Sequence, residues 1–464
     1  MFPVIGITQT YISESYESGQ LEGGAGIIQI DDTIFSLTWQ YDLSKYSLLL
    51  AKIDTNGNRI FEYSIADTVD MIVGLKGFFE FGNYFIGYGQ SAVAGSPTPL
   101  IFKFDRQGNV LWLKNSFPIG ALQAEYDGGV IGNDDSSFVF TGTIETLSNG
   151  FDVLVAKTDT FGNIIYEETI GGVEHEQGYS IVNSLDTGYV ISGYTKSTDP
   201  NGNHLVLKVN ENCQSIWLRQ YGTSTGFEGG VVTAGINGYW ICGTWDYSGS
   251  FTSHISKLDS QGFIINSLIF SDIEMEHSNL FRGTELPNKE FIGIGIYKST
   301  SNTFTQGWII KVDSNCNELW NRKIDIRTAD HFLNDVIISN NSTLLACGYV
   351  GPDGSGNTQD LWIVGMDSLG CDSLGCHTLG ISEFVNLPLI TIWPNPTASN
   401  LNISFESPVI GVTKIYNQMG QLVHSQLISG EEINLDLSFI LPGVHHLVVS
   451  VGGRQISKSF IKSQ

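Results

Sequence analysis

The stretch Lys103-Phe-Asp-Arg-Gln-Gly-Asn-Val-Leu-Trp112 decides the fold, because a chain of 464 residues keeps returning to its pattern. Related stretches begin at residues 52, 103, 157, 208, 257 and 311, and a degraded seventh copy begins at residue 365. Successive copies are 51, 54, 51, 49, 54 and 54 residues apart. A repeat of about fifty residues is typical of propellers and solenoids. The period therefore predicts one repeat body that takes up most of the chain.

Each repeat has the pattern of four short strands. In the fourth repeat, apolar alternation and aromatic or β-branched residues predict strands over 178–183, 188–194, 204–209 and 215–220. The Asp-x-x-Gly-Asn piece is then the hairpin turn between the third and fourth strands, with a glycine at positive φ and an aspartate that bonds backbone amides. The aromatic residue at the tenth position is expected to pack between neighbouring blades. These aromatic residues are Phe61, Trp112, Tyr166, Trp217 and Trp320.

Seven turn patterns predict a seven-bladed β-propeller of four-stranded blades over residues 1–378, a ring that leaves only short protected edges. Residues 4–11 resemble the outer strand of a repeat, and the seventh repeat lacks a good fourth strand. We therefore expect the N-terminal strand to complete the last blade.

Composition excludes several classes of protein. The formal net charge of −25 disfavours binding to nucleic acids and to anionic membranes, which both require cationic contacts. No run approaches the roughly 20 apolar residues that span a bilayer. The first residues lack the basic and apolar regions of a signal peptide, so we expect an exported form to have lost that peptide.

The repeat ends at about residue 379, where the composition changes. We expect a linker over 379–387 and a small Ig-like β-sandwich over 388–464, in which seven short alternating strands follow one another closely. The all-β prediction therefore covers the whole chain.

The C-terminal segment carries an ordered set of motifs. Ile392-Trp-Pro-Asn-Pro396, Ile415-Tyr-Asn-Gln-Met-Gly-Gln-Leu-Val423, Leu441-Pro-Gly-Val444 and Lys458-Ser-Phe-Ile-Lys462 follow in sequence. This order resembles the type A C-terminal sorting domain of the type IX secretion system of the Bacteroidota. One departure is His445, where the family usually has Tyr. The positions that carry the resemblance are Pro394, Asn395, Pro396, Gly420, Gly443 and Lys458.

This resemblance implies that the type IX machinery is a partner and that the folded cargo crosses the outer membrane. The cargo would then be secreted or held at the outer cell surface, with the sorting domain removed. The Gly-Asn-x-x-Trp ending of the repeats is also similar to the tryptophan-docking repeat of quinoproteins, which makes a quinoprotein the third candidate.

Acidic residues cluster before successive innermost strands and would line one mouth of the channel. The alternative roles for these acidic residues are a plain solvated rim, a binding site for a cation or a glycan, and an acid–base pair for glycan cleavage. The Asp54 turn does not have the spacing of an EF-hand, so we expect it to be a structural turn. No cofactor is predicted, and calcium binding stays an open alternative. The rim residues are Glu22, Glu125, Glu174, Glu176, Glu228, Glu274, Glu276 and Asp330, with His175, His277 and His331 nearby.

Loops between the second and third strands are rich in Ser, Asn, Gly and aromatic residues, as in 245–251, 298–304 and 351–357. Variable polar and aromatic loops on a rigid scaffold are where recognition concentrates. Plain solvent loops are the alternative. The candidate ligand-binding residues are Trp245, Tyr247, Phe251, Glu176, Glu228 and Glu276.

The six cysteines are too few for a disulfide scaffold. Cys371 and Cys376 are the predicted bridge, five residues apart in a Gly-rich segment. The matching offsets of Cys213 and Cys316 from two strand cysteines permit inter-blade bridges without requiring them.

These observations predict a recognition, adhesion or scaffold protein whose propeller face engages a polysaccharide or a surface protein. No nucleophile-plus-base motif occurs, which favours a role without catalysis. The alternative is a glycan-active hydrolase or lyase that uses carboxylates at the channel rim.

Overall fold

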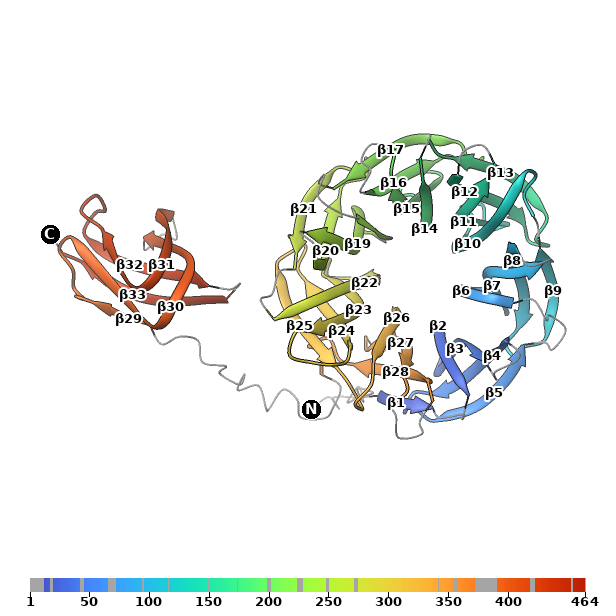
Figure 1. The fold of residues 1–464 in the computed structure, drawn as a ribbon, viewed down its shortest axis with the longest axis horizontal. Coiled ribbons are helices and arrows are strands. Elements are labelled where there is room, and N and C mark those ends of the chain that lie inside the picture. Colours follow the sequence, from blue (N-terminus) through green and yellow to red (C-terminus); the bar gives the residue numbers. More distant parts are fainter. Residues whose placement is uncertain are drawn as a thin grey trace, which may run out of the picture. The chain divides into compact units, whose positions relative to one another are not determined.

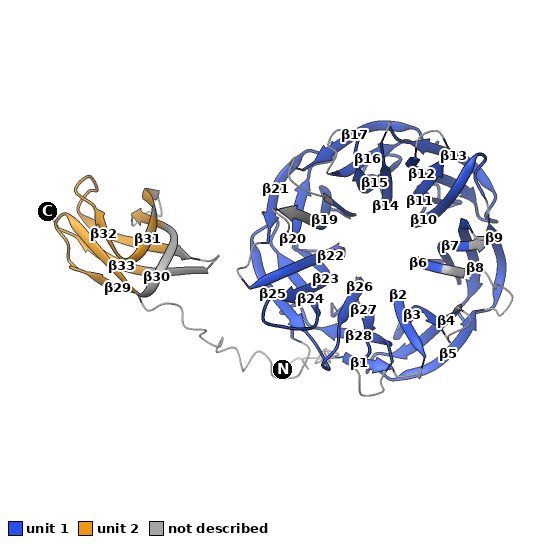
Figure 2. Cartoon of the chain, in the orientation of Figure 1, with its two compact units in different colours: residues 1–374 blue, residues 375–464 orange. Residues whose placement is uncertain are grey.

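The computed structural model divides the chain into two compact units, residues 1–374 and 375–464, which are coloured separately in Figure 2. It describes residues 12–16, 20–41, 46–65, 72–93, 96–115, 117–147, 150–172, 174–197, 202–222, 228–247, 250–270, 274–340, 342–353, 358–371, 390–417, 422–451 and 454–463. The predicted linker over 379–387 lies outside these residues. Among the residues described, no helix has the length and apolar character to cross a membrane.

The first unit is a ring of seven four-stranded antiparallel sheets, as the repeat predicts (Figure 1). The innermost strands are β2 (Leu21–Ile30), β6 (Ile72–Phe81), β10 (Ala121–Ile131), β14 (Glu176–Asn183), β18 (Glu228–Gly235), β22 (Met275–Glu285) and β26 (His331–Ile338). The second strands are β3 (Thr33–Tyr41), β7 (Tyr84–Val93), β11 (Ser137–Thr146), β15 (Tyr189–Thr195), β19 (Gly238–Tyr247), β23 (Phe291–Ser299) and β27 (Leu344–Val350).

The outer half of each blade consists of its third and fourth strands. The third strands are β4 (Tyr46–Asp54), β8 (Ser96–Asp105), β12 (Gly150–Asp159), β16 (Asn203–Val209), β20 (Ser250–Leu258), β24 (Gln306–Val312) and β28 (Asp360–Met366). The fourth strands are β5 (Arg59–Ile65), β9 (Val110–Asn115), β13 (Ile164–Ile170), β17 (Ser215–Tyr221), β21 (Ile264–Ile269), β25 (Glu318–Ile324) and, in the seventh blade, β1 (Ile12–Tyr16).

An N-terminal strand closes the ring. β1 runs antiparallel to β28, with Ile12 opposite Gly365 and Tyr16 opposite Leu361. Ile12 is 2% exposed and belongs to the core that also contains Ile53 and Ile363. The closing strand that we find is thus Ile12–Tyr16, whereas the predicted segment 4–11 lies outside the described residues.

The repeated Asp-x-x-Gly-Asn piece forms the expected turn between the third and fourth strands. In the first blade, the Asp54 carboxylate accepts hydrogen bonds from the backbone N–H of Asn56 (2.9 Å) and of Asn58 (2.8 Å), and from the Asn58 amide (2.9 Å). Gly57 has a φ of 86°. These hydrogen bonds, led by the one from the Asn58 side chain, hold the pKa of Asp54 below its usual value. The aspartate therefore serves the turn itself.

Tryptophans at the tenth position join neighbouring blades, as expected. A Cβ atom placed on Gly262 would lie 2.6 Å from the Trp217 ring of the preceding blade, and one on Gly370 would lie 3.1 Å from Trp320. The expectation is wrong for two other residues of this set, because Phe61 is 58% exposed and Tyr166 is 41% exposed. In the first blade, Tyr63 takes over the contact, 2.9 Å from a Cβ placed on Gly108.

The second unit is a five-stranded sheet around its own core. Its strands are β29 (Thr391–Trp393), β30 (Asn400–Asn417), β31 (Leu422–Asp436), β32 (Gly443–Val451) and β33 (Arg454–Lys462). Five strands replace the seven predicted ones, because β30 and β31 each run through two predicted segments. Leu401 and Leu447, from the first half of β30 and from β32, meet in one core.

The motif residues of this unit tie its ends together. The Asn395 side-chain oxygen accepts a hydrogen bond from the backbone of Ile461 (2.9 Å), which links the Pro-Asn-Pro segment to β33. His445 is buried, stacks on Phe460 and donates from Nε2 to the Leu441 carbonyl (2.9 Å). Lys458 is exposed, and Gly420 lies outside the described residues.

Candidate functional site

One residue from each innermost strand points toward the axis of the propeller. In six blades this residue is a β-bulge, an extra residue that the pairing with the second strand skips. Bulges redirect side chains and are frequent beside functional sites. We call this set the channel ring, and with the unbulged residue of the fifth blade it consists of Ala25, Lys76, Asp127, Tyr179, Val231, Phe281 and Asn334.

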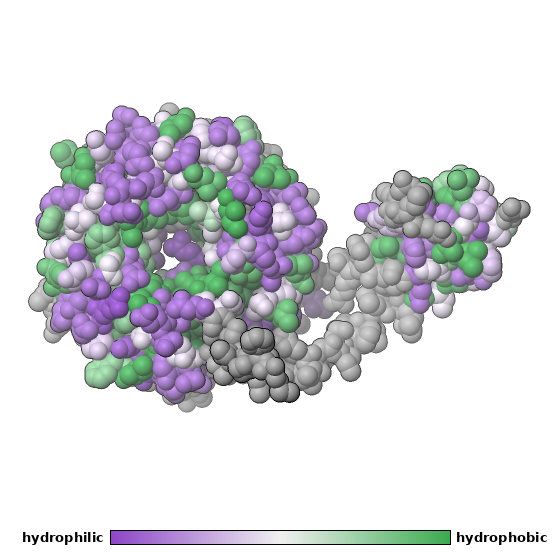
Figure 3. Space-filling model, turned by 180° about the vertical axis from the view of Figure 1, so that it is seen from behind, coloured by the Kyte–Doolittle hydropathy of each residue, from purple (hydrophilic) through white to green (hydrophobic). Residues whose placement is uncertain are grey.

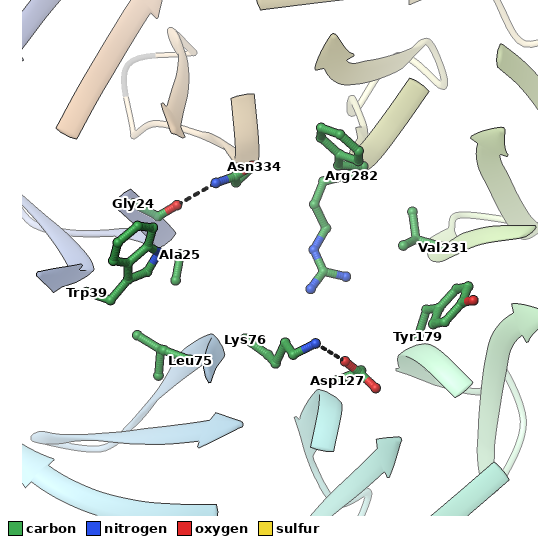
Figure 4. Close-up of a pocket in the computed structure, with 11 residues that line it drawn as sticks. Gly24, Ala25, Trp39, Leu75, Lys76, Asp127, Tyr179, Val231, Arg282 and Asn334 are labelled. Atoms are coloured by element: carbon green, nitrogen blue, oxygen red, sulfur yellow. Dashed lines mark hydrogen bonds and ion pairs between the residues drawn. The ribbon is translucent and has the colours of Figure 1, made fainter. Parts of the chain in front are cut away.

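The channel ring lines a cavity of about 340 Å³ in the propeller, which we call the channel cavity (Figure 4). Trp39, Leu75 and Arg282 also contribute to its wall. A space-filling view from behind shows a central opening in the ring, surrounded by a largely hydrophilic face (Figure 3). Every blade therefore contributes to one central site.

Charged side chains meet in the channel cavity. The Lys76 Nζ lies 2.7 Å from Asp127 Oδ1 and 3.3 Å from Glu125 Oε2. Burial raises the pKa of Asp127 to about 6, against the opposing charge of Lys76 and with the help of Glu125. Burial works against the charged form of Lys76, but the two carboxylates outweigh it and raise the pKa of this amine. One ammonium is thus shared by two carboxylates.

A second polar pocket, of about 230 Å³, lies between blades 2, 3 and 4, and we call it the mouth pocket. Its residues come from the ends of strands where the second strand of a blade meets the third. The Gln123 amide donates to Glu145 (2.6 Å), and Tyr179 donates to Gln177 Oε1 (2.7 Å). The lining residues are Gln90, Pro97, Gln123, Ala124, Glu125, Thr143, Glu145, Phe151 and Gln177.

The mouth pocket and the channel cavity share a wall. Glu125 lines the mouth pocket, whereas its partner Lys76 lines the channel cavity. On β10, polar side chains occupy every second position at Gln123, Glu125 and Asp127. This one strand therefore carries polar groups from the mouth pocket to the channel cavity.

The structure gives Glu176 a structural role in place of the predicted ligand contact. It is 3% exposed, and its carboxylate accepts hydrogen bonds from Thr195 Oγ1 (2.7 Å), Ser197 Oγ (2.6 Å) and the Gly172 N–H (2.6 Å). Glu22 is equally buried and is bonded to Gln40 (3.0 Å) and Arg59 (3.3 Å). Two members of the predicted acidic rim therefore belong to the interior.

The remaining predicted site residues have different surroundings. Glu276 is half exposed and lies 3.6 Å from Lys298, and Phe251 is 47% exposed at the start of β20. The side chains of Trp245, Tyr247 and Glu228 lie outside the described part of the structure, so their contribution to ligand binding stays a prediction.

The described residues include one disulfide-bonded cysteine and four free ones, and they offer no cluster that could bind a metal ion. Cys371 is disulfide-bonded, and its predicted partner Cys376 lies outside the described residues. Cys213, Cys242, Cys316 and Cys347 are free and buried, so the permitted inter-blade bridges are not formed. In the part of the chain that the structure describes, no group of three or more His, Cys, Asp or Glu side chains could hold a metal ion.

Sequence reasoning missed Lys76, Asp127 and Arg282. The signal was present as spacing, since the channel ring residues follow one another after 51, 51, 52, 52, 50 and 53 residues. Their chemistry differs from blade to blade, however, so no repeated motif marks them.

Fold and C-terminal unit together define a class, that of exported β-propeller proteins with a sorting domain. Residues 391–463 match the family described as Secretion system C-terminal sorting domain. They form a type IX sorting domain, so the protein is secreted or located at the outer cell surface and interacts with the type IX machinery.

Solved structures show a distant similarity in fold. The β-propeller domain of the Trilobed protease from Pyrococcus furiosus is 9% identical, with a TM-score of 0.43 over 75% of this chain and 94% of that one. Sqt1 from Chaetomium thermophilum is 14% identical, with a TM-score of 0.43 over 76% and 89%. The polysaccharide lyase Uly1 is 9% identical, with a TM-score of 0.43 over 79% and 94%. No curated protein sequence matches the chain.

Proposed function

We propose that this exported propeller is a recognition module that binds a carbohydrate in the mouth pocket. The observation that carries the proposal is the lining of this pocket, where three glutamine amides, two carboxylates and one aromatic ring converge from blades 2, 3 and 4. Secretion or surface display brings such a pocket into contact with extracellular polysaccharides.

The chemistry of the lining matches that of a sugar. Each glutamine amide offers two donors and an acceptor, and each carboxylate accepts hydrogen bonds, so both complement hydroxyl groups. The ring of Phe151 supplies an apolar surface for the C–H face of a pyranose. A pocket of about 230 Å³ encloses only part of an oligosaccharide, which suits binding at a chain end or a branch.

The test is a glycan array probed with the full chain, with calcium and again with a chelator. We expect Phe151→Ala to weaken the signal at least about tenfold, because one stacking face and its buried area are lost. Phe161→Ala is the matched control, since Phe161 is 69% exposed in the turn between the third and fourth strands of the same blade. It should bind like the wild type. Loss of the signal with chelator would add calcium to the site.

A blank array under both conditions would contradict carbohydrate recognition and would favour a protein partner. Equal binding by the wild type and Phe151→Ala would place any recognised glycan elsewhere, with the Phe251 loop as the next surface to replace.

One observation favours the enzyme as a second candidate. Glu125 and Glu145 line the same pocket, and pairs of carboxylates perform acid–base chemistry on glycosidic bonds. A hydrolase or lyase would release new chain ends from the bound glycan. Glu125→Gln and Glu145→Gln would then abolish release while binding persists, whereas a pure recognition module releases nothing in any variant.

A further inference from the structure

The guanidinium of Arg282 is a charged group of the channel cavity for which the described residues supply no partner. Arg282 lies on β22 directly after the bulge residue Phe281, and Figure 4 shows its guanidinium directed toward the middle of the cavity. Among the described residues, no hydrogen bond or ion pair reaches this guanidinium. Its positive charge nevertheless acts on two nearby carboxyl groups. Burial raises the pKa of Asp127 and of Asp335, and the charge of Arg282 lowers it.

The carboxylates around Arg282 are engaged by other groups. Asp127 is bound to Lys76 at 2.7 Å. Asp335 is half-buried, and its two oxygens accept hydrogen bonds from the backbone N–H groups of Ile27 and Val336, both at 3.0 Å. The five N–H donors of Arg282 therefore face the cavity.

The apolar wall of the cavity would strengthen hydrogen bonds between the Arg282 guanidinium and a bound anion. Ala25, Leu75, Val231 and Phe281 provide apolar surface on several sides. Charge-assisted hydrogen bonds are stronger in such surroundings than in water, and a guanidinium matches two oxygens of one anion in a planar fork. A volume of about 340 Å³ exceeds what a tetrahedral or planar oxyanion with its first waters requires.

We propose that the channel cavity binds an oxyanion, a carboxylate or a sulfate group, through two-point contact with Arg282. The group is either a free ion or the acidic substituent of a larger molecule. This inference does not rest on the mouth pocket, because Phe151 takes no part in it.

The test is a calorimetric titration of the full chain with sodium sulfate, with sodium chloride at matched ionic strength as the reference. We expect saturable binding of sulfate and none of chloride. Arg282→Gln should weaken sulfate binding at least about tenfold, because both charge and fork are lost. Arg106→Gln is the matched control, since it removes one positive charge from a turn on the second blade and should leave the affinity unchanged.

Arg282→Lys covers the case in which the glutamine variant does not fold. A lysine keeps the charge but offers no planar fork, so we expect an intermediate loss. Galacturonate in place of sulfate distinguishes a sugar-borne acid, which should bind more tightly than sulfate, from a free ion.

Acidification provides a second readout. The charged and titratable groups that face Asp127 are Lys76, Glu125, Arg282, Tyr88 and Tyr179. Protonation of Asp127 below a pH of about 6 removes a negative charge from the cavity, so sulfate should bind more tightly at about pH 5 than at about pH 7.5. Absence of saturable binding for both anions, or equal affinity in the wild type and either Arg282 variant, would overturn the proposal. Weaker sulfate binding at the lower pH would do the same.

Discussion

Two buried histidines between blades 4 and 5 make the propeller sensitive to acid. His204 Nδ1 lies 3.2 Å from His254 Nε2, and His204 Nε2 lies 2.5 Å from Ser192 Oγ. Both rings are at most 2% exposed. Burial lowers the pKa of His254 from 6.5 to about 4, and it lowers the pKa of His204 well below 6.5, with the neighbouring His254 adding to the effect.

The direction of the effect follows from the difference between the pKa of each ring in the unfolded chain and its pKa in the folded chain. The unfolded chain takes up the proton at about pH 6.5, whereas the folded chain resists it. Stability is therefore complete above a pH of about 6.5 and is lost as the pH falls toward the pKa of the folded state. For His254 the difference between 6.5 and about 4 is worth about 3.4 kcal/mol, and about 2 kcal/mol of this is already lost at about pH 5.

Urea unfolding of the wild type and of His254→Gln at about pH 7.5 and about pH 5 measures this effect. Glutamine keeps hydrogen-bonding groups but does not titrate, so the drop in the free energy of unfolding between the two pH values should be about 2 kcal/mol smaller in the variant. His446→Gln, an exposed position in the other unit, is the control and should leave the propeller transition unchanged. An equal drop in wild type and His254→Gln would show that protonation of His254 does not cause the loss of stability in acid.

Two further predictions concern the ring closure and the turns. Ile12→Ala should lower the free energy of propeller unfolding by about 2–5 kcal/mol, because Ile12 is buried at the closing strand, whereas Ile60→Ala, at a 51% exposed position, should have little effect in the same denaturation assay. Gly108→Ala should lower the free energy of unfolding by more than the roughly 1–2 kcal/mol that a non-glycine residue costs in the left-handed conformation, because its Cβ would lie 2.9 Å from Tyr63. Gly82→Ala is the control, with a φ of 61° and open space around it, and should show the backbone cost alone. Equal losses at these two glycines would contradict the close contact between blades.

The sequence was sufficient for the architecture because the architecture is repeated. The Asp-x-x-Gly-Asn turn needs the same aspartate and the same positive φ in most blades, so its chemistry recurs as a motif. Even the exceptions keep the geometry, since Cys213 and Cys316 adopt φ values of 67° and 62° at the glycine position. Blade number and strand number follow directly from counting these turns.

The candidate site could not be derived in the same way. A bulge at Lys76 or Asp127 arises from the pairing of two strands, and the sequence of one strand does not display it. The burial of Glu176 depends on the hydroxyl groups of Thr195 and Ser197, which are about twenty residues away in the chain. The sequence therefore predicts Glu176 at the channel rim, whereas the pairing of strands within its blade places it in the interior.

Hydrogen–deuterium exchange of the full chain, with and without the oligosaccharide selected on the array, locates the carbohydrate-binding site on the propeller. We expect slower exchange at the start of β10, at the end of β11 and at the start of β12, where Gln123, Glu145 and Phe151 line the mouth pocket. The turns between the third and fourth strands should exchange as before. Protection confined to those turns, or no protection at saturating ligand, would show that the mouth pocket does not bind the oligosaccharide.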